Sequence, residues 1–376
     1  MTRVIHLSAV ALLLAGVLRF YDSRDGFTAL ISFGERYSAS VVPALRDLPH
    51  KVSPHSEGYD GQFYAQMALD PLLRDPATDR AQDDPALRAR RILFSWTAYI
   101  LGLGRPAWIL QAFALQNVLS WLVFGVVLRR WFRLDTPRGI ALWLVTVFSA
   151  GLLWSIRRAL LDGPSLLILV LAVASIEKGR QWTAAILCGL AGLARETNTL
   201  ALFALLEPWT WTTWRSSARA AGLVAVALAP LAIWFDYIHS IYRSRIFTSG
   251  ETLAFPFAGL LWRAQVAGEQ ILGGAVRRDL PTIVTVLAFA SQIIWLLARP
   301  RWRDPWWRMG VAFAALFPFL GQPLWTGMLP TVVRVELPML VAFNVGLLHV
   351  KRADLFWTLL ACGNATLLLE PLLGIF

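Results

Sequence analysis

Hydrophobic residues occur along this chain in long, nearly uninterrupted runs, and polar residues gather in the segments between them. A membrane-spanning helix needs about 20 mostly apolar residues, and about eleven runs bounded by charge, proline or glycine meet or approach this length. These runs cover residues 4–20, 107–128, 139–155, 163–176, 182–194, 197–211, 218–235, 281–297, 309–325, 329–350 and 355–376. The pattern therefore predicts an all-α polytopic membrane protein.

Composition and charge agree with this prediction. Hydrophobic residues make up 57% of the chain and charged residues only 16%, whereas soluble domains carry about a quarter charged residues. The net charge of +11 could indicate a nucleic-acid partner. If the N-terminus is cytoplasmic, however, 15 of the 35 basic residues lie in segments on the cytoplasmic side. This is the bias of the positive-inside rule, so we expect the charge to orient the helices and expect no nucleic-acid partner.

In this orientation the first apolar run is an uncleaved anchor, and two long segments face the periplasm. They are residues 21–106 and residues 236–280, and the second contains an amphipathic helical pattern between residues 257 and 272. We detect no internal repeat, so residues 1–376 are treated as a single transmembrane domain. Function is expected on the outward face, where the large loops lie.

The first outer segment contains the densest polar motif of the chain, residues 57–71. A helix ending before Pro71 would place Asp60 in its first turn. Asp60 could simply favour the positive end of the helix dipole. Alternatively, it is a general base that takes a proton from a hydroxyl nucleophile. In that case the polar residues around it, Glu57, Tyr59, Gln62 and Tyr64, are candidates for substrate contacts.

Asp84 and Pro85 form an N-cap and first-turn pair that opens a helix carrying Arg88, Arg90 and Arg91. Arginines near a membrane surface can extend their charge to lipid headgroups. Arg88 and Arg91 also share one helix face, from which they could grip a phosphate group. Both interpretations are open from the sequence.

Two apolar runs of only 14 and 13 residues, 163–176 and 182–194, are too short to cross the hydrocarbon core. Their outer ends would lie below the membrane surface, in a recess of the outer leaflet. The recess would hold polar residues from three turns, namely Arg158, Asp162, Arg195, Glu196 and Arg334. Ionisable groups at such depth usually face a cavity. Arg195 and Glu196 could instead pair with each other; otherwise the recess suits the phosphate of a lipid carrier.

Several other kinds of site have no support in the sequence. The five histidines are scattered singly, the two cysteines lie inside apolar runs, and neither a P-loop nor a zinc motif is present. We therefore expect no metal and no cofactor.

Three short stretches resemble a known family. They are residues 59–64 with 68–71, residues 88–93, and residues 193–197. This combination is similar to bacterial polytopic proteins of cell-surface glycopolymer formation, which share the plan of the GT-C glycosyltransferases, including the GPI mannosyltransferases. The stretch around Arg334 fits the C-terminal Arg-x-x-x-Pro pattern of that group only loosely.

The resemblance implies a GT-C-like helical bundle and a polyprenyl-phosphate-linked sugar as donor. Asp60 matches the acidic residue of the family's first outer loop, and Arg91 and Arg195 would lie near the donor phosphate. The expected reaction is an inverting transfer to a glycan or lipid acceptor on the periplasmic face of the bacterial inner membrane. Two alternatives stay open: a transporter or flippase for a lipid-linked saccharide, and a noncatalytic scaffold.

Overall fold

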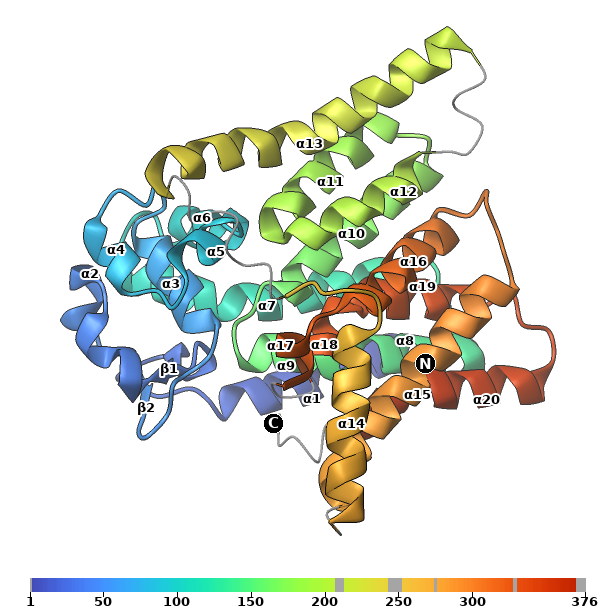
Figure 1. The fold of residues 1–376 in the computed structure, drawn as a ribbon, viewed down its shortest axis with the longest axis horizontal. Helices are drawn as coiled ribbons and strands as arrows, with labels where there is room; N and C mark the ends of the chain where they lie inside the picture. Colours follow the sequence, from blue (N-terminus) through green and yellow to red (C-terminus); the bar gives the residue numbers. More distant parts are fainter. Residues whose placement is uncertain (1, 207–212, 243–251, 274–275, 327–329, 370–376) are drawn as a thin grey trace.

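The computed structural model describes residues 2–206, 213–242, 252–273, 276–326 and 330–369, and most of these residues are helical. Two layers lie side by side in Figure 1. A layer of short helices, formed by the first predicted outer segment and called the outer layer below, occupies the left of the view. A bundle of longer helices fills the rest.

The bundle contains the apolar runs of the sequence. Its helices are α1 (Thr2–Leu18), α7 (Pro106–Leu128), α8 (Pro137–Val147), α9 (Ala150–Arg157), α10 (Asp162–Glu177), α11 (Gln181–Ala194), α12 (Leu202–Leu205), α13 (Trp214–Tyr242), α14 (Ala258–Leu272), α15 (Val276–Ala298), α16 (Pro305–Leu316), α17 (Gln322–Thr326), α18 (Pro330–Val335), α19 (Leu337–Leu347) and α20 (Ala353–Gly363).

In the described part of the chain, four helical stretches are long and apolar enough to cross a membrane, namely Pro106–Leu128, Pro137–Arg157, Trp214–Tyr242 and Asp279–Ala298. The second of them joins α8 and α9. Several other predicted spans form apolar helices of 17 residues or fewer, such as α1, α11, α19 and α20. The all-helical, polytopic prediction is confirmed, whereas the number of eleven spans stays a prediction.

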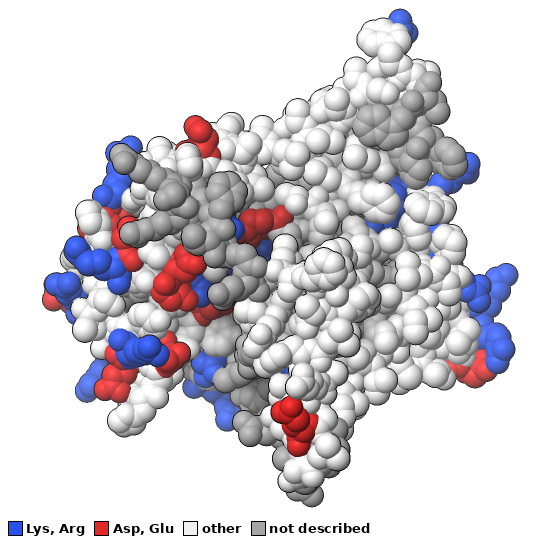
Figure 2. Space-filling model, viewed as in Figure 1, with Lys and Arg blue, Asp and Glu red and all other residues white. Residues whose placement is uncertain are grey.

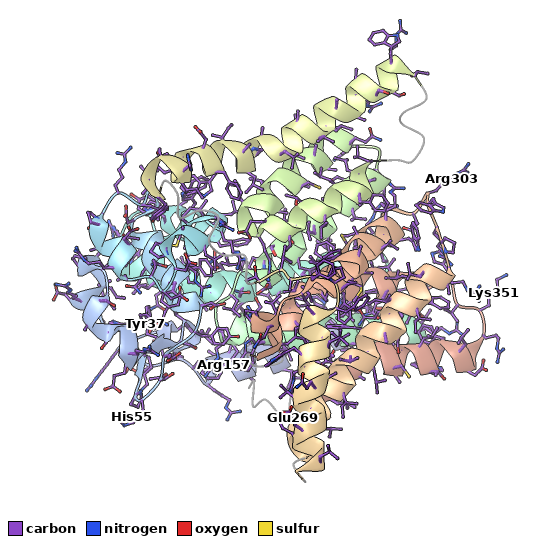
Figure 3. All side chains as sticks on the ribbon, viewed as in Figure 1. Tyr37, His55, Arg157, Glu269, Arg303 and Lys351 are labelled. Atoms are coloured by element: carbon purple, nitrogen blue, oxygen red, sulfur yellow. The ribbon has the colours of Figure 1, made fainter. Side chains whose placement is uncertain are left out.

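Charged side chains follow the same layout. Figure 2 shows blue and red residues over the layer on the left and blue residues with a small red patch at the right edge, with a mostly uncharged surface between that carries one red patch near its lower end. Figure 3 places Arg303 and Lys351 at that right edge. An uncharged band between two charged ends is the surface that a bilayer requires, because ionised groups are costly in its core.

The layer on the left consists of short elements joined by tight turns. They are β1 (Phe33–Gly34), the 3₁₀ helix η2 (Glu35–Ser40), α2 (Pro43–Arg46), β2 (Val52–Ser53), α3 (Gly61–Leu69), α4 (Pro76–Arg80), α5 (Pro85–Ala89) and α6 (Leu93–Leu101). The two short strands pair in parallel. Asp75 and Asp84 accept hydrogen bonds from backbone N–H groups at the starts of α4 and α5, as the cap prediction for Asp84 requires.

Helix α3 begins where the chain passes very close to the bundle. A Cβ atom added to Gly61 would lie 2.3 Å from the carbonyl oxygen of Arg158 and 3.0 Å from that of Ile31. Only glycine allows this approach. Gly61 therefore lets the start of α3, with Asp60 before it, lie directly against the turn that follows α9.

The second predicted outer segment, residues 236–280, includes the end of α13 and the start of α15. Helix α13 continues to Tyr242, and α15 begins at Val276 and includes Pro281. The amphipathic pattern forms α14 as predicted. Residues 243–251 and 274–275 of this segment lie outside the described residues.

Candidate active site

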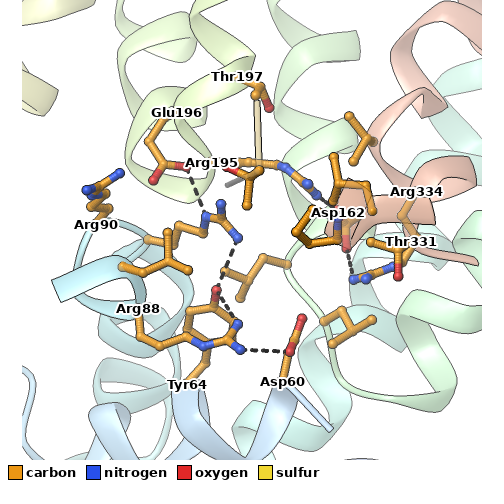
Figure 4. Close-up of a pocket in the computed structure, with 18 of the residues that line it drawn as sticks. Asp60, Tyr64, Arg88, Arg90, Asp162, Arg195, Glu196, Thr197, Thr331 and Arg334 are labelled. Carbon is orange, nitrogen blue, oxygen red and sulfur yellow. Dashed lines mark hydrogen bonds and ion pairs between the residues drawn. The ribbon is translucent and has the colours of Figure 1, made fainter. Parts of the chain in front are cut away.

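A cavity of about 490 Å³ lies where the outer layer meets the bundle. Eight charged residues line it, and they come from five separate parts of the chain (Figure 4): Asp60, Arg88, Arg90, Arg91, Asp162, Arg195, Glu196 and Arg334. Five arginines thus face three carboxylates among the described lining residues. This excess of positive charge favours an anionic ligand.

Asp60 directly precedes α3 but does not cap it, because its side chain accepts no hydrogen bond from the helix N–H groups. Its carboxylate instead accepts a hydrogen bond of 2.9 Å from Arg88 Nη2. Asp60 is therefore not a hydrogen-bonding cap of α3, although it lies at the start of the helix, where the helix dipole favours its charge. About a third of the side chain, 35%, stays exposed.

The charge state of Asp60 results from two opposing effects. Burial in the wall of the cavity raises the pKa of its carboxyl group, but the positive charges of Arg88 and Arg334 and the hydrogen bond from Arg88 lower it more. The pKa of Asp60 lies below its ordinary value as a result. The carboxylate is therefore ionised at neutral pH and available as a proton acceptor.

Helix α5 ends at Ala89, so it carries Arg88 but not Arg90 and Arg91, and the predicted helix through all three arginines is shorter than expected. Arg88 and Arg91 nevertheless reach the same side chain. Their guanidinium groups both donate to the Tyr64 hydroxyl at 3.4 Å. Arg88 also donates to Asp83 at 2.7 Å and 2.9 Å, and lies over the ring of Phe63. Because these contacts hold it from several sides, Arg88 presents a fixed donor to Asp60.

Arg91 connects the outer layer to the bundle. Its Nε donates at 2.9 Å to Glu196, the first residue of the 3₁₀ helix η3 (Glu196–Ala201) that follows α11. Burial raises the pKa of Glu196, but the charge of Arg91 lowers it more, so its pKa also lies below the ordinary value. Arg195 and Glu196 therefore do not pair with each other, and the self-paired alternative is wrong.

Asp162, at the start of α10, joins two further arginines at the bottom of the cavity. It accepts a hydrogen bond of 2.9 Å from Arg334 of α18 and another from Arg195. Arg334 also lies 3.5 Å from the Tyr59 hydroxyl, across 275 positions of the sequence. Four residues expected in the recess, Asp162, Arg195, Glu196 and Arg334, thus line one cavity.

Polar atoms without partners surround the same cavity. Within the part of the chain that the structure describes, Arg90 Nε, Arg195 Nε, Glu196 Oε1 and Thr197 Oγ1 are buried and form no hydrogen bond. Buried polar groups are normally satisfied, so a cluster of exceptions needs an explanation. A polar ligand in the cavity would provide the missing partners.

Three predicted site residues do not line the cavity. Glu57 pairs with Arg36 at the exposed edge of the outer layer. The amide of Gln62 is buried and holds the backbone of Gly34 and Glu57. Arg158 lies on the other side of Tyr59, with its guanidinium 5.5 Å from the ring centre. Glu57 and Gln62 thus shape the loop around Asp60 from outside the cavity.

The cavity also includes residues that the sequence reasoning left out of the site. They are Arg90 and the three threonines Thr197, Thr252 and Thr331. Arg90 belongs to the arginine run 88–91 and could have been included on that ground. Thr197 belongs to the quoted stretch 193–197 and could have been included in the same way. Thr252 and Thr331 carry no signal in the sequence, because only the fold brings their separate segments together. No group of three His, Cys, Asp or Glu side chains in the described residues could hold a metal ion.

Comparison with known proteins gives a similarity to solved structures. No protein-family model and no curated protein matches the sequence. The chain is similar to the crystal structure of ArnT from Cupriavidus metallidurans in the apo state, with 18% sequence identity and a TM-score of 0.46. The similar region covers 97% of this chain but only 65% of ArnT, so the chain spans about two thirds of that protein's length.

Proposed function

We propose that the protein is a GT-C-type glycosyltransferase that moves a sugar from a polyprenyl-phosphate carrier to an acceptor hydroxyl at the outer face of the membrane. The observation that carries this proposal is the composition of the cavity. One partly exposed carboxylate, Asp60, faces a cluster of arginines within a single recess beside a helical membrane bundle.

The arginines suit the phosphate of a lipid-linked donor. A guanidinium stays charged at every physiological pH and offers a planar fork to two phosphate oxygens. Arg91, Arg195 and Arg334 converge on the cavity from three different elements. The carboxylates Glu196 and Asp162 hold them in place, so little reorganisation is needed when the leaving phosphate gains charge.

An apolar groove next to the cavity suits the lipid part of the donor. It has a volume of about 540 Å³ and is lined only by apolar residues of α14, α15, α16 and the following turn. Two segments form a common wall between groove and cavity. Backbone hydrogen bonds join Ala254 to Phe319 and Phe257 to Pro318, and Leu253 and Leu320 face the cavity. A carrier chain in the groove would leave its phosphate at the arginines.

The proposed reaction is an inverting displacement. Asp60 accepts the proton of the acceptor hydroxyl while that oxygen forms a bond to the anomeric carbon of the sugar. The bond between this carbon and the phosphate oxygen breaks, and polyprenyl phosphate leaves with its negative charge on the arginines. The hydroxyl becomes strongly acidic only as its new bond forms. A carboxylate of low pKa is therefore a sufficient base at that stage.

Incubation of the purified protein with a set of polyprenyl-phosphate sugars tests this proposal. We expect at least one donor to yield free polyprenyl phosphate together with a glycosylated acceptor. If the protein instead moves intact lipid-linked sugars across a proteoliposome membrane, and no donor is cleaved, then it is a transporter and the proposal fails.

A further inference from the structure

Two adjacent arginines lie just outside the cavity, on the far side of Tyr59. They are Arg157 and Arg158, at the end of α9, where the outer layer meets the bundle (Figure 3). Arg158 donates to the Ser32 hydroxyl at 3.0 Å and lies over the rings of Tyr59 and Trp154. Arg157 lies over the ring of Phe20, 4.1 Å from its centre.

This pair differs from four of the five arginines that line the cavity. Arg88, Arg91, Arg195 and Arg334 each form an ion pair with a carboxylate. Within the described residues, neither Arg157 nor Arg158 forms one. Two consecutive residues therefore carry half-buried positive charges that have no carboxylate partner in the described part of the chain, although like charges repel.

Two simpler explanations account for only part of this arrangement. A helix C-terminus favours cations, and arginines near a membrane can extend to headgroups. Arg158, however, points inward onto two aromatic rings. The surrounding backbone is also strained, since Ser32 and Ala159 adopt positive φ angles of 63° and 46°. Such backbone strain is costly and is concentrated at functional sites.

Tyr59 links the pair to the proposed reaction centre. Two guanidinium groups lie near its ring, with Arg158 at 5.5 Å and Arg334 at 5.7 Å from the ring centre. Asp60 is the next residue, and the backbone at Gly61 lies so close to the carbonyl oxygen of Arg158 that no Cβ atom fits between them. An anion at Arg158 and a donor phosphate at Arg334 would thus both lie near Tyr59 and Asp60.

We infer that Arg157 and Arg158 form a second anion-binding subsite, which holds a phosphate group of the acceptor. This inference rests on the proposed transferase function and adds the chemical class of the acceptor, an envelope lipid or glycan that carries phosphate. Binding there would direct a hydroxyl of the acceptor toward Asp60. The bound phosphate group would also be the counter-ion of the two arginines.

Binding of dodecyl phosphate to the purified full-length protein in a neutral detergent, followed by native mass spectrometry, tests the inference without any turnover. We expect the wild type to bind two molecules. The double variant Arg157→Gln and Arg158→Gln should bind one, and so should the double variant Arg195→Gln and Arg334→Gln. The matched control, Arg129→Gln with Arg130→Gln, changes an adjacent pair at the other end of the bundle and should still bind two.

A second measurement distinguishes binding of an acceptor phosphate from binding of the phosphate groups of membrane lipids. The measurement is repeated in nanodiscs of phosphatidylcholine and of phosphatidylglycerol. We expect the second molecule to bind in both. If phosphatidylglycerol displaces it, or if the Arg157 and Arg158 variant still binds two molecules, the inference is refuted. Donor cleavage is assayed separately on the same preparations, so a preparation that cleaves donor but lacks the second site refutes only this inference.

Discussion

Replacement of Gly61 by alanine tests whether the close approach of α3 to the bundle sets the position of Asp60. A Cβ atom at residue 61 would lie 2.3 Å from the Arg158 carbonyl oxygen, whereas real Cβ contacts essentially never fall below 3.0 Å. The two backbones must therefore separate by about 0.7 Å at this point. The obstacle is a backbone carbonyl, so no flexible side chain can move aside.

The displacement acts directly on the residue before Gly61. A misplacement of about 1 Å at a reacting group can reduce the rate by about 100-fold. We expect Gly61→Ala to lower kcat for sugar transfer by one to two orders of magnitude, that is, by about 1.4 to 2.7 kcal/mol in the barrier. Initial rates of polyprenyl phosphate release at saturating donor measure this effect.

The matched control is Gly268→Ala in α14, where an added Cβ meets no atom within 4 Å. Because alanine is a better helix former than glycine by about 1 kcal/mol, this variant should be fully active and slightly more stable. Wild-type kcat in Gly61→Ala, with both variants folded to the same extent, would refute the argument that this contact positions Asp60.

Three further predictions concern neighbouring residues. Arg88→Gln removes a charge that lowers the pKa of Asp60, whereas burial still raises this pKa, so the acid limb of the pH–rate profile should move to higher pH. An acid limb at the wild-type pH would exclude Asp60 as the titrating base. Arg334→Lys keeps the positive charge but loses the planar pair of donors that a guanidinium offers to a phosphate, so we expect the KM for the donor to rise about tenfold. Equal KM values for wild type and variant would contradict this prediction. Asp84→Ala removes the cap of α5 and should lower the free energy of unfolding by about 1 kcal/mol, which thermal denaturation in detergent would show as a lower midpoint.

Local patterns in the sequence were sufficient to identify the outer helices and the candidate base. The helix after Asp60 and the cap at Asp84 depend on residues within a few positions of one another. The predicted helix does not extend to Arg91, because α5 ends at Ala89, yet Arg88 and Arg91 are close enough in the chain to reach one hydroxyl.

Local sequence patterns could not predict which charged residues pair with each other. Arg195 is adjacent to Glu196 in the sequence, yet it pairs with Asp162, and Glu196 pairs with Arg91 across 105 positions. Such pairs depend on how the helices pack together, which the hydrophobic pattern leaves undetermined. For the same reason Gln62, which looked like a site residue, is committed to holding the backbone of its own loop.

The central claim is that Asp60 is the base of a sugar transfer from a lipid-linked donor. The most direct test compares wild type, Asp60→Asn and Asp60→Glu with a donor that the wild type cleaves, and measures both transfer and donor binding. We expect Asp60→Asn to bind the donor but to transfer sugar about 100 to 10,000 times more slowly, with partial recovery in Asp60→Glu. Transfer by Asp60→Asn at the wild-type rate would contradict the account.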